Sequence, residues 1–324
     1  MIVNTCPEFG VELTLVVPYA YWLHKQGNLE KVITSKGMRP FYYFCDNVEE
    51  RYDHRTIDNK AAGMDLIPNN WIYGLKEYAE LYKDEWPEWQ EFADVDRGCG
   101  ILKYDQWELP DYNAHFKNDI FKFDKPFIVI SNRYNWEHGQ PPAGYFSIEC
   151  LYNMFNILTE KGYIVIYKRP DNTEFPLDQN EANTIINKET LTANVEGVGL
   201  ITDYELVKHY DDVYLLDDIV SKHLDLTYNE VQINLFTNAN GHIAMGGGSS
   251  LLPCLFRNDK HIAYYGGTLT EINRKCFWKD SKGNKNIKNY NYMINPNLIP
   301  FIDKDNVDLN NQHKEFLNTI KQTF

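Results

Sequence analysis

Several residues that could bind an anion directly follow short apolar segments in the second half of the chain. They are Arg133 after residues 127–131, Lys168 and Arg169 after residues 163–167, and Gly246-Gly247-Gly248-Ser249-Ser250 after residues 242–245. Glycine lets backbone N–H groups approach an anion closely, and arginine can form paired, charge-assisted hydrogen bonds with phosphate oxygens. We therefore predict that the glycine-rich loop and these cations bind a phosphate group.

The order of the apolar segments indicates which elements position these residues. Strands are predicted over residues 127–131, 163–167, 212–216, 242–245 and 261–265, with helices between them over residues 146–161, 203–209, 229–238 and 251–256. Strands that alternate with helices at this spacing are typical of a doubly wound parallel sheet. Ligands of such sheets bind beyond the carboxyl ends of the strands, which is where the cations and the glycine-rich loop fall.

The length of 324 residues favours two domains. A strand over residues 1–5, a helix over residues 12–25 and a strand over residues 40–45 predict a β-α-β unit, with Pro18 expected to kink the helix. We expect an α/β protein with two Rossmann-like domains, whose parallel sheets face each other across a cleft. The predicted domains are residues 1–124 and 125–324, with the hinge at residues 124–126 and a last helix, over residues 311–323, packing back on the first domain.

Other functions of a glycine-rich loop have to be weighed against the phosphate site. The loop does not match the dinucleotide pattern GxGxxG, and it lacks the lysine of a P-loop. Tight packing of a helix against a strand also favours glycine, and an arginine after a strand is often a solvated surface residue. The phosphate site therefore depends on the cations and the loop meeting at one sheet edge.

Composition excludes several classes of partner. The net charge of −14 argues against nucleic acid and anionic membranes as general partners. The apolar run 13–23 is too short to span a bilayer and follows no basic segment, so we expect a cytoplasmic, soluble protein. Six cysteines form no CxxC pair. Asp94-Val95-Asp96 has the spacing of the DxD motif that binds a metal in some sugar transferases, but an acidic pair close before a glycine is usually a solvated turn, so no metal site is predicted.

Two features of the sequence resemble known enzymes. The two-domain layout resembles the GT-B class of glycosyltransferases. More narrowly, residues 130–136 (ISNRYNW) are similar to the strand-end arginine motif of fucosyltransferase-like enzymes, and the run from residues 202–208 to residues 245–250 is similar to the path to their serine-rich donor loop. The similarity spans residues 126–265. The chain has one arginine where that family usually has a pair or a triplet.

The resemblance implies a glycosyltransferase that moves a hexosyl or pentosyl group from a nucleotide-diphosphate donor to a glycan hydroxyl. It implies a metal-independent reaction in which the nucleotide sugar is a co-substrate and no cofactor is bound. Inversion is favoured over retention only because no second acidic motif follows the glycine-rich loop. The implied donor-binding residues are Arg133, Lys168, Arg169, Gly247, Gly248, Ser249, Ser250 and Tyr265, with Trp136 as a further candidate. Two alternatives remain: a nucleotide-sugar epimerase or hydrolase of the same architecture, and a non-catalytic binder of carbohydrate or nucleotide. The donor, acceptor and oligomeric state stay open.

Transfer to a hydroxyl requires a general base in addition to the groups that stabilise the departing diphosphate. Glu8 directly follows the first predicted strand and is our candidate for this base, so the predicted catalytic residues are Glu8 and Arg133. The competing candidates are Glu12, His24, Asp46 and Asp53. Glu12 and His24 also have a simpler interpretation, because each would complement the dipole at its end of the helix.

Overall fold

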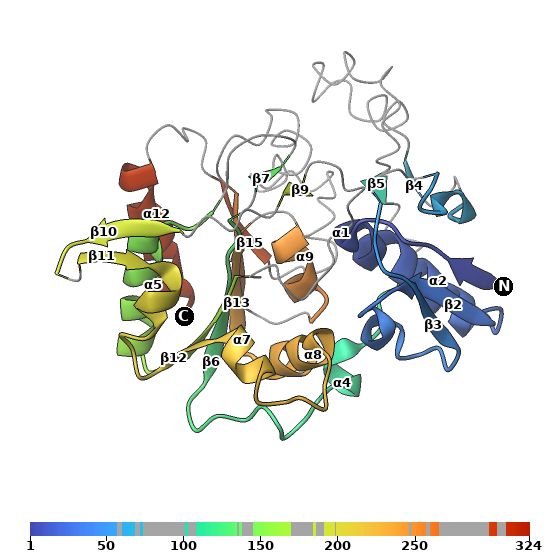
Figure 1. Cartoon of the computed structure of the whole chain (residues 1–324), viewed down its shortest axis with the longest axis horizontal. Coiled ribbons are helices and arrows are strands. Elements are labelled where there is room, and N and C mark those ends of the chain that lie inside the picture. The colour runs from blue at the N-terminus through green and yellow to red at the C-terminus, as the bar shows by residue number, and fades with distance from the viewer. Residues whose placement is uncertain are drawn as a thin grey trace, which may run out of the picture. The chain divides into compact units, whose positions relative to one another are not determined.

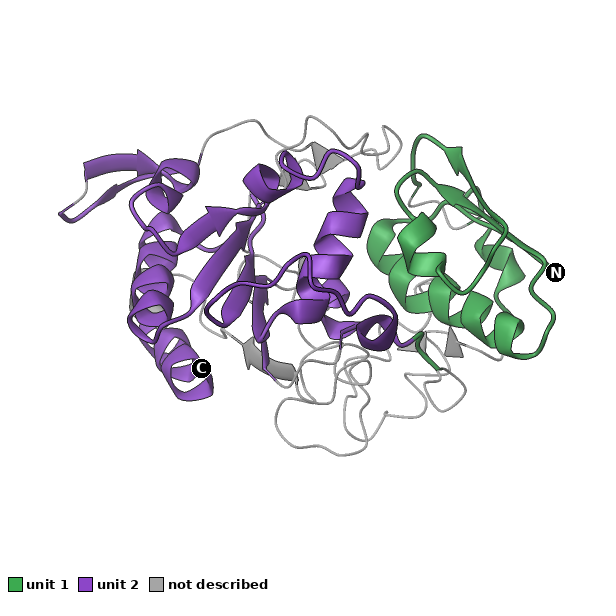
Figure 2. Cartoon of the chain, turned by 90° about the horizontal axis from the view of Figure 1, so that it is seen from below, with its two compact units in different colours: residues 1–110, 178–181 green, residues 111–177, 182–324 purple. Residues whose placement is uncertain are grey.

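The computed structural model divides into two compact units, coloured green and purple in Figure 2. It describes residues 1–56, 60–68, 72–73, 101–102, 108–134, 136–137, 145–169, 184–185, 191–197, 199–245, 248–256, 260–265, 298–302 and 309–324. Unit 1 comprises residues 1–110 and 178–181, and unit 2 comprises residues 111–177 and 182–324. Each unit contains a parallel sheet with helices, so the protein belongs to the α/β class (Figure 1).

Unit 1 is built on the parallel strands β1 (Ile2–Asn4), β2 (Lys31–Ser35) and β3 (Val48–Tyr52), in that order. A continuous helical run follows β1, made of α1 (Phe9–Val11), a π-helical segment (Glu12–Val16) and α2 (Val17–Lys25). Pro18 lies in the first turn of α2. Proline has no N–H to donate, so the regular α-helical hydrogen bonding is interrupted there. The predicted helix is confirmed, with a π-helical segment that ends two residues before Pro18.

The strand predicted over residues 40–45 is wrong. Residues Arg39–Tyr42 form a 3-10 helix, η2, in which Phe41 and Tyr42 are buried. Proline is a poor member of a central strand because it cannot donate to the ladder, and Phe41 instead packs edge-on against Phe9, 5.5 Å away between ring centroids. The strands that pair in this sheet are instead β2, which precedes this segment in the chain, and β3, which follows it.

Unit 2 is built on a six-stranded parallel sheet in the order β12-β8-β6-β13-β14-β15. The strands are β6 (Phe127–Ser131), β8 (Ile164–Lys168), β12 (Val213–Leu215), β13 (Gly241–Met245), β14 (His261–Tyr265) and β15 (Leu298–Ile302). Every residue of β6 and β13 is buried, as expected for central strands covered on both faces. The five strands predicted in this half are confirmed, and β15 extends the sheet by a sixth.

The described helices of unit 2 are α4 (Tyr112–His115), α5 (Ile148–Glu160), α6 (Asp203–Val207), α7 (Leu216–Val220), α8 (Tyr228–Asn238), α9 (Gly248–Cys254) and α12 (Leu309–Thr323). Four of them, α4, α5, α6 and α8, begin after a residue whose side chain caps the first turn. The Ser147 hydroxyl accepts from the Cys150 amide at the start of α5. Thr202 with Glu205, and Thr227 with Glu230, form complete capping boxes on α6 and α8.

Short elements complete the described structure. In unit 1 these are the 3-10 helix η3 (Met64–Leu66) and the antiparallel pair β4 (Ile72–Tyr73) and β5 (Ile101–Leu102). In unit 2 they are the antiparallel pairs β7 (Trp136–Glu137) with β9 (Thr184–Ile185), and β10 (Thr192–Val195) with β11 (Gly199–Thr202).

The boundary between the units lies between residues 110 and 111 rather than at residue 124. Segment 111–124 packs on unit 2, where the Asn118 side chain donates to the Asn234 carbonyl (2.8 Å) and accepts from the Asn238 amide (3.2 Å). Helix α12 belongs to unit 2, where it lies beside α5 (Figure 1), and its predicted packing on the first domain stays a prediction. Phe316 of α12 stacks on Phe146 with ring centroids 5.6 Å apart, so the helix closes the hydrophobic core of its own sheet.

Candidate functional site

All strands of the unit 2 sheet are parallel, but the direction in which the chain adds strands to the sheet reverses at its centre, between β6 and β13. From β6 the chain continues through β8 to β12 on one side, and it then returns through β13, β14 and β15 on the other. Ser131, the last residue of β6, pairs with Lys168 of β8 on one side and Ala244 of β13 on the other. The carboxyl ends of strands at such a reversal form the usual ligand site of an open parallel sheet.

Three of the segments predicted to hold the donor therefore meet at one sheet edge. Arg133 follows β6, Lys168 ends β8 with Arg169 directly after it, and Gly248 opens α9 after β13. Gly246 and Gly247 lie outside the described residues. The backbone of Ser249 and Ser250 is part of α9, whereas their side chains, with those of Trp136 and Tyr265, lie outside the description. The two cationic segments and the start of α9 thus follow neighbouring strands of one parallel sheet, and their joint binding of a donor stays a prediction.

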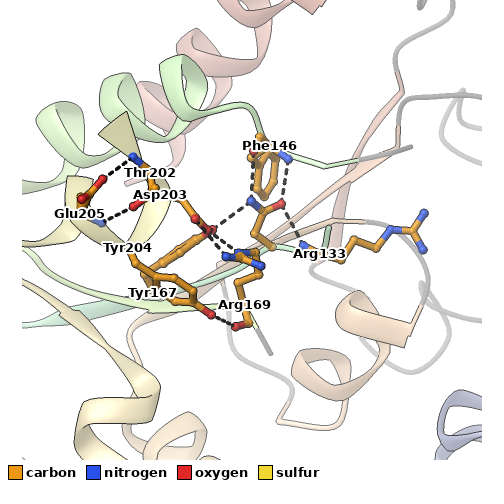
Figure 3. A network of polar contacts seen from close by, with 9 residues as sticks. Arg133, Phe146, Tyr167, Arg169, Thr202, Asp203, Tyr204 and Glu205 are labelled. Atoms are coloured by element: carbon orange, nitrogen blue, oxygen red, sulfur yellow. Dashed lines mark hydrogen bonds and ion pairs between the residues drawn. The ribbon is translucent and has the colours of Figure 1, made fainter. Parts of the chain in front are cut away.

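Asn132 is the centre of a buried network of hydrogen bonds, shown in Figure 3. Its Nδ2 donates to the Phe146 carbonyl (3.0 Å) and to the Tyr167 hydroxyl (3.0 Å). Its Oδ1 accepts from the backbone amides of Arg133 (2.9 Å) and Phe146 (2.8 Å). One side chain thus ties the end of β6 to the segment that enters α5. The sequence interpretation passed over Asn132 because nothing in its local spacing indicates these partners.

Arg169 is committed to a buried ion pair, which differs from its predicted contact with a donor phosphate. Its Nε and Nη2 donate to the two carboxylate oxygens of Asp203, at 2.5 and 3.0 Å. The Arg169 side chain is 7% exposed and that of Asp203 is fully buried. The guanidinium also lies 4.5 Å from the ring centroid of Tyr204, whose hydroxyl donates to the Arg169 carbonyl. We therefore assign Arg169 to holding β8 against α6.

Arg133 extends away from this network (Figure 3). Its backbone amide is held by Asn132, and the residue is half-buried at the central reversal of the sheet. An arginine held by its backbone at this place presents a planar set of N–H donors, which match the oxygens of a phosphate. The position of Arg133 is that expected of the predicted anion-binding group.

Lys168 is the second cation at this edge. Burial lowers the pKa of its ammonium group to about 8, although the negative charge of Asp217 acts in the opposite direction. The ammonium nitrogen lies 5.7 Å from the ring centroid of Phe236. A partly desolvated cation at a ligand-binding edge interacts more strongly with an anion than a fully hydrated one does. Lys168 is thus suited to bind a phosphate group.

Glu8 lies at the carboxyl end of β1, where it is exposed and caps the start of α1 without a side-chain capping bond. Glu12, four residues later, is fully buried. Its Oε1 accepts from the hydroxyls of Thr34 and, at 2.8 Å, Tyr42. Within the described residues, its Oε2 has no hydrogen-bond partner. Glu12 therefore does more than complement the helix dipole, because it links the π-helical segment to β2 and η2.

The environment of Glu12 is chemically unusual. Burial raises the pKa of its carboxyl group, against the opposing effects of the Arg55 charge and the hydroxyls of Thr34 and Tyr42. The Arg55 guanidinium lies 5.1 Å from the ring centroid of Phe9. Raised carboxyl pKa values and π-helical segments are both enriched at functional sites, although a buried structural acid can show the same properties. Glu12 thus becomes a second candidate for the general base.

The remaining candidates for the base have structural roles or lie at the surface. His24 stacks on Tyr21, with ring centroids 6.2 Å apart, Asp53 pairs with Lys36, and Asp46 is exposed. Asp94 and Asp96 lie outside the described residues. In the part of the chain that is described, no three His, Cys, Asp or Glu side chains are grouped as metal ligands, and no helix is long and apolar enough to cross a bilayer.

Comparisons with known proteins add two likenesses. No family model and no curated protein match the chain. Solved structures that resemble it include E. coli ADP-heptose LPS heptosyltransferase II, with a TM-score of 0.49 at 10% identity over 99% of this chain and 98% of that chain. They also include E. coli heptosyltransferase WaaC with ADP-2-deoxy-2-fluoro heptose, with a TM-score of 0.42 at 10% identity over 82% and 88%. Neither is a fucosyltransferase. At this level of similarity the activity has to be argued from the site itself.

Proposed function

We propose that the chain is a glycosyltransferase that moves a sugar from a nucleotide-diphosphate donor to a glycan hydroxyl. The observation that carries the proposal is the pair of cations, Arg133 and Lys168, beside the central reversal of the unit 2 sheet. With a net charge of −14 on the chain, an anionic ligand has to be met by local cations, and this edge supplies them.

The two cations suit the chemistry of sugar transfer. When the bond between the anomeric carbon and the diphosphate breaks, negative charge grows on the leaving diphosphate while the sugar becomes oxocarbenium-like. Arg133 can bind two phosphate oxygens at once, and Lys168 adds a second positive charge from a less hydrated position. Positive groups held in place before the reaction stabilise this charge most effectively. We propose that these residues stabilise the negative charge of the leaving diphosphate without a bound metal or cofactor.

The acceptor hydroxyl has to lose its proton as it attacks the anomeric carbon. We propose Glu8 as the base, because its side chain is exposed at the carboxyl end of the unit 1 sheet, which is where ligands of parallel sheets bind. The raised pKa and the unengaged Oε2 of Glu12 favour it as the second candidate. Direct attack assisted by such a base inverts the configuration at the anomeric carbon, and inversion is therefore the proposed outcome.

The test separates transfer from its alternatives. Thermal shift with GDP, UDP, ADP and CMP identifies the nucleotide that stabilises the protein. Hexose, pentose and heptose donors of that nucleotide are then incubated with and without glycan acceptors, in the presence of EDTA. Release of nucleotide only with acceptor supports transfer. Release without acceptor assigns a hydrolase, conversion of the donor sugar without release assigns an epimerase, and binding without turnover assigns a non-catalytic binder. No stabilisation by any nucleotide would reject the donor site.

A further inference from the structure

The amide of Asn132 uses every hydrogen-bonding position it has. An asparagine side chain offers two N–H donors and one oxygen with two lone pairs. Here both donors are used, by the Phe146 carbonyl and the Tyr167 hydroxyl, and both lone pairs are used, by the backbone amides of Arg133 and Phe146. The side chain is 1% exposed, so water does not compete for these bonds. The amide therefore has one orientation in which all four bonds form.

That orientation is set from the far end of the network, on β8 and α6. The Asp203 carboxylate is held by Arg169, and as an ionised group it can only accept hydrogen bonds. The Tyr167 hydroxyl must therefore donate its single proton to Asp203, over 2.8 Å. Burial and the Asp203 charge raise the pKa of Tyr167 well above its ordinary value, so this proton is retained.

A hydroxyl that donates to Asp203 can only accept from Asn132. The NH2 group of Asn132 therefore has to face Tyr167, and Oδ1 has to face the backbone amides of Arg133 and Phe146. Reversing the amide would place its oxygen against the Phe146 carbonyl and leave the two backbone N–H groups without their acceptor. The ion pair of Arg169 with Asp203 thus fixes the backbone of Arg133, through two intervening side chains.

We propose that Asn132 is a positioning residue for the donor site: it fixes the backbone from which Arg133 extends, with its own orientation set by Tyr167 and Asp203. This proposal rests on the proposed function, because it gives Arg133 the task of binding the donor diphosphate. Asn132 itself need not touch the ligand. Its effect is expected in the affinity for nucleotide, and only when Arg133 is present.

A double-mutant cycle on the full-length protein tests the coupling. The ligands are ADP, GDP and UDP, with inorganic pyrophosphate as a probe that lacks a base, and calorimetry gives their dissociation constants. Tyr167→Phe removes one hydroxyl and is expected to weaken binding of the tightest nucleoside diphosphate about fivefold to tenfold, the usual effect of one buried hydrogen bond. In the Arg133→Ala protein the same substitution is expected to leave the affinity unchanged.

Tyr210→Phe is the matched control. Tyr210 also packs against the core of unit 2, and its hydroxyl donates to Asn156 Oδ1 at 2.8 Å, but it has no bond to the Asn132 network. Both Tyr→Phe variants are expected to lower the melting temperature, and only Tyr167→Phe to lower nucleotide affinity. A merely structural role of Tyr167 predicts the same affinity for the two variants.

The outcomes separate this proposal from the proposed function. If Arg133→Ala weakens binding and Tyr167→Phe does not, or weakens it equally in both backgrounds, the positioning role is wrong and the donor site stands. If Arg133→Ala binds nucleotide like the wild type, both proposals are overturned. If Tyr167→Phe fails to fold, Asn132→Asp replaces it in the cycle. Asp retains an acceptor for the two backbone amides and loses the donors to Phe146 and Tyr167. Its added negative charge repels the diphosphate in both backgrounds, so the expected result is a larger loss of affinity with Arg133 present than with Arg133→Ala.

Discussion

The Arg169 guanidinium binds both carboxylate oxygens of Asp203, with Nε and Nη2 at 2.5 and 3.0 Å, in a part of unit 2 where neither side chain is more than 7% exposed. Two charges in such a place are stable only together, because each has lost its hydration. The pair joins the carboxyl end of β8 to the first turn of α6, and it is the starting point of the network that ends at Arg133.

Removing one partner of this pair is expected to destabilise unit 2 strongly. Asp203→Asn leaves the Arg169 charge buried without its counter-ion, and the expected loss in the free energy of unfolding is about 3–5 kcal/mol. Urea unfolding followed by circular dichroism measures it. The control is Asp212→Asn, which breaks the exposed pair of Asp212 with Lys125 and should cost less than about 1 kcal/mol. Equal losses in the two variants would show that the buried pair stabilises the protein no more than the exposed pair does.

Nucleotide affinity is expected to fall as the pH rises through the pKa of Lys168. The ammonium group is charged below its pKa of about 8 and neutral above it, so its attraction for a diphosphate is present at pH 7 and lost at higher pH. Between pH 7 and pH 9 the dissociation constant should rise by up to about tenfold. Calorimetry across this range measures the change. Lys168→Met should bind weakly at both pH values, whereas the exposed Lys208→Met should behave like the wild type; a pH dependence retained in Lys168→Met would contradict the assignment.

The two carboxylates after β1 can be told apart by conservative substitution. Glu8→Gln is expected to lower kcat by about a hundredfold or more, the usual contribution of a general base, and to leave nucleotide affinity unchanged. Steady-state kinetics and calorimetry give the two quantities. Glu12→Gln keeps an oxygen to accept from Thr34 and Tyr42 and serves as the comparison. Full activity of Glu8→Gln together with an inactive, folded Glu12→Gln would transfer the role to Glu12.

Acid is expected to destabilise unit 2 through two histidines that pair across β13 and β14. Burial lowers the pKa of His261 to about 3 and, together with the nearby His261, lowers the pKa of His242 well below its ordinary value. Both side chains are neutral in the folded protein, whereas in the unfolded chain they bind protons below a pKa of about 6.5. The free energy of unfolding is therefore unaffected by these histidines above pH ~6.5 and decreases as the pH falls from there towards about 3. The expected slope in that window is up to about 1.4 kcal/mol per pH unit for each histidine.

Urea unfolding between pH 7 and pH 4 checks this slope. His261→Gln is expected to be less stable at pH 7 and to show a shallower decline with acid, because it cannot take up a proton. His209→Gln, at an exposed position, should reproduce the wild-type decline. A wild-type slope that persists in His261→Gln would place the acid sensitivity elsewhere.

Local sequence pattern predicted the second unit well because its elements are strongly apolar and clearly separated. The predicted strand over residues 127–131 coincides with β6, and the amphipathic helix predicted over residues 146–161 coincides with α5 to within two residues at its start. In the first unit the same reasoning predicted a strand over residues 40–45 and missed the strand β2. The apolar side chains at 41 and 42 are buried through tertiary contacts in a 3-10 helix, which a period-two pattern cannot distinguish from a strand.

The candidate site was predictable in outline and not in its contacts. The rule that ligands bind at the carboxyl ends of parallel strands placed Arg133 and Lys168 at one edge. Whether an arginine there is available to a ligand depends on partners far away in the sequence, and Asp203 lies 34 residues from Arg169. The capping box of Thr202 and Glu205 predicts that a helix begins at Asp203, but no local signal shows that Asp203 faces inward.

The order of strands in the unit 2 sheet also has a consequence for how the protein folds. Strand β6 pairs with β8 across a local helical connection, but its other neighbour, β13, comes much later, and the Asn240 side chain that accepts from the Phe127 amide is 113 residues away. Contacts of such large sequence separation form slowly, because a long loop has to close first. Half of the sheet can thus assemble early, while the edge that carries Arg133 and the start of α9 is completed only when the two ends of this long loop meet.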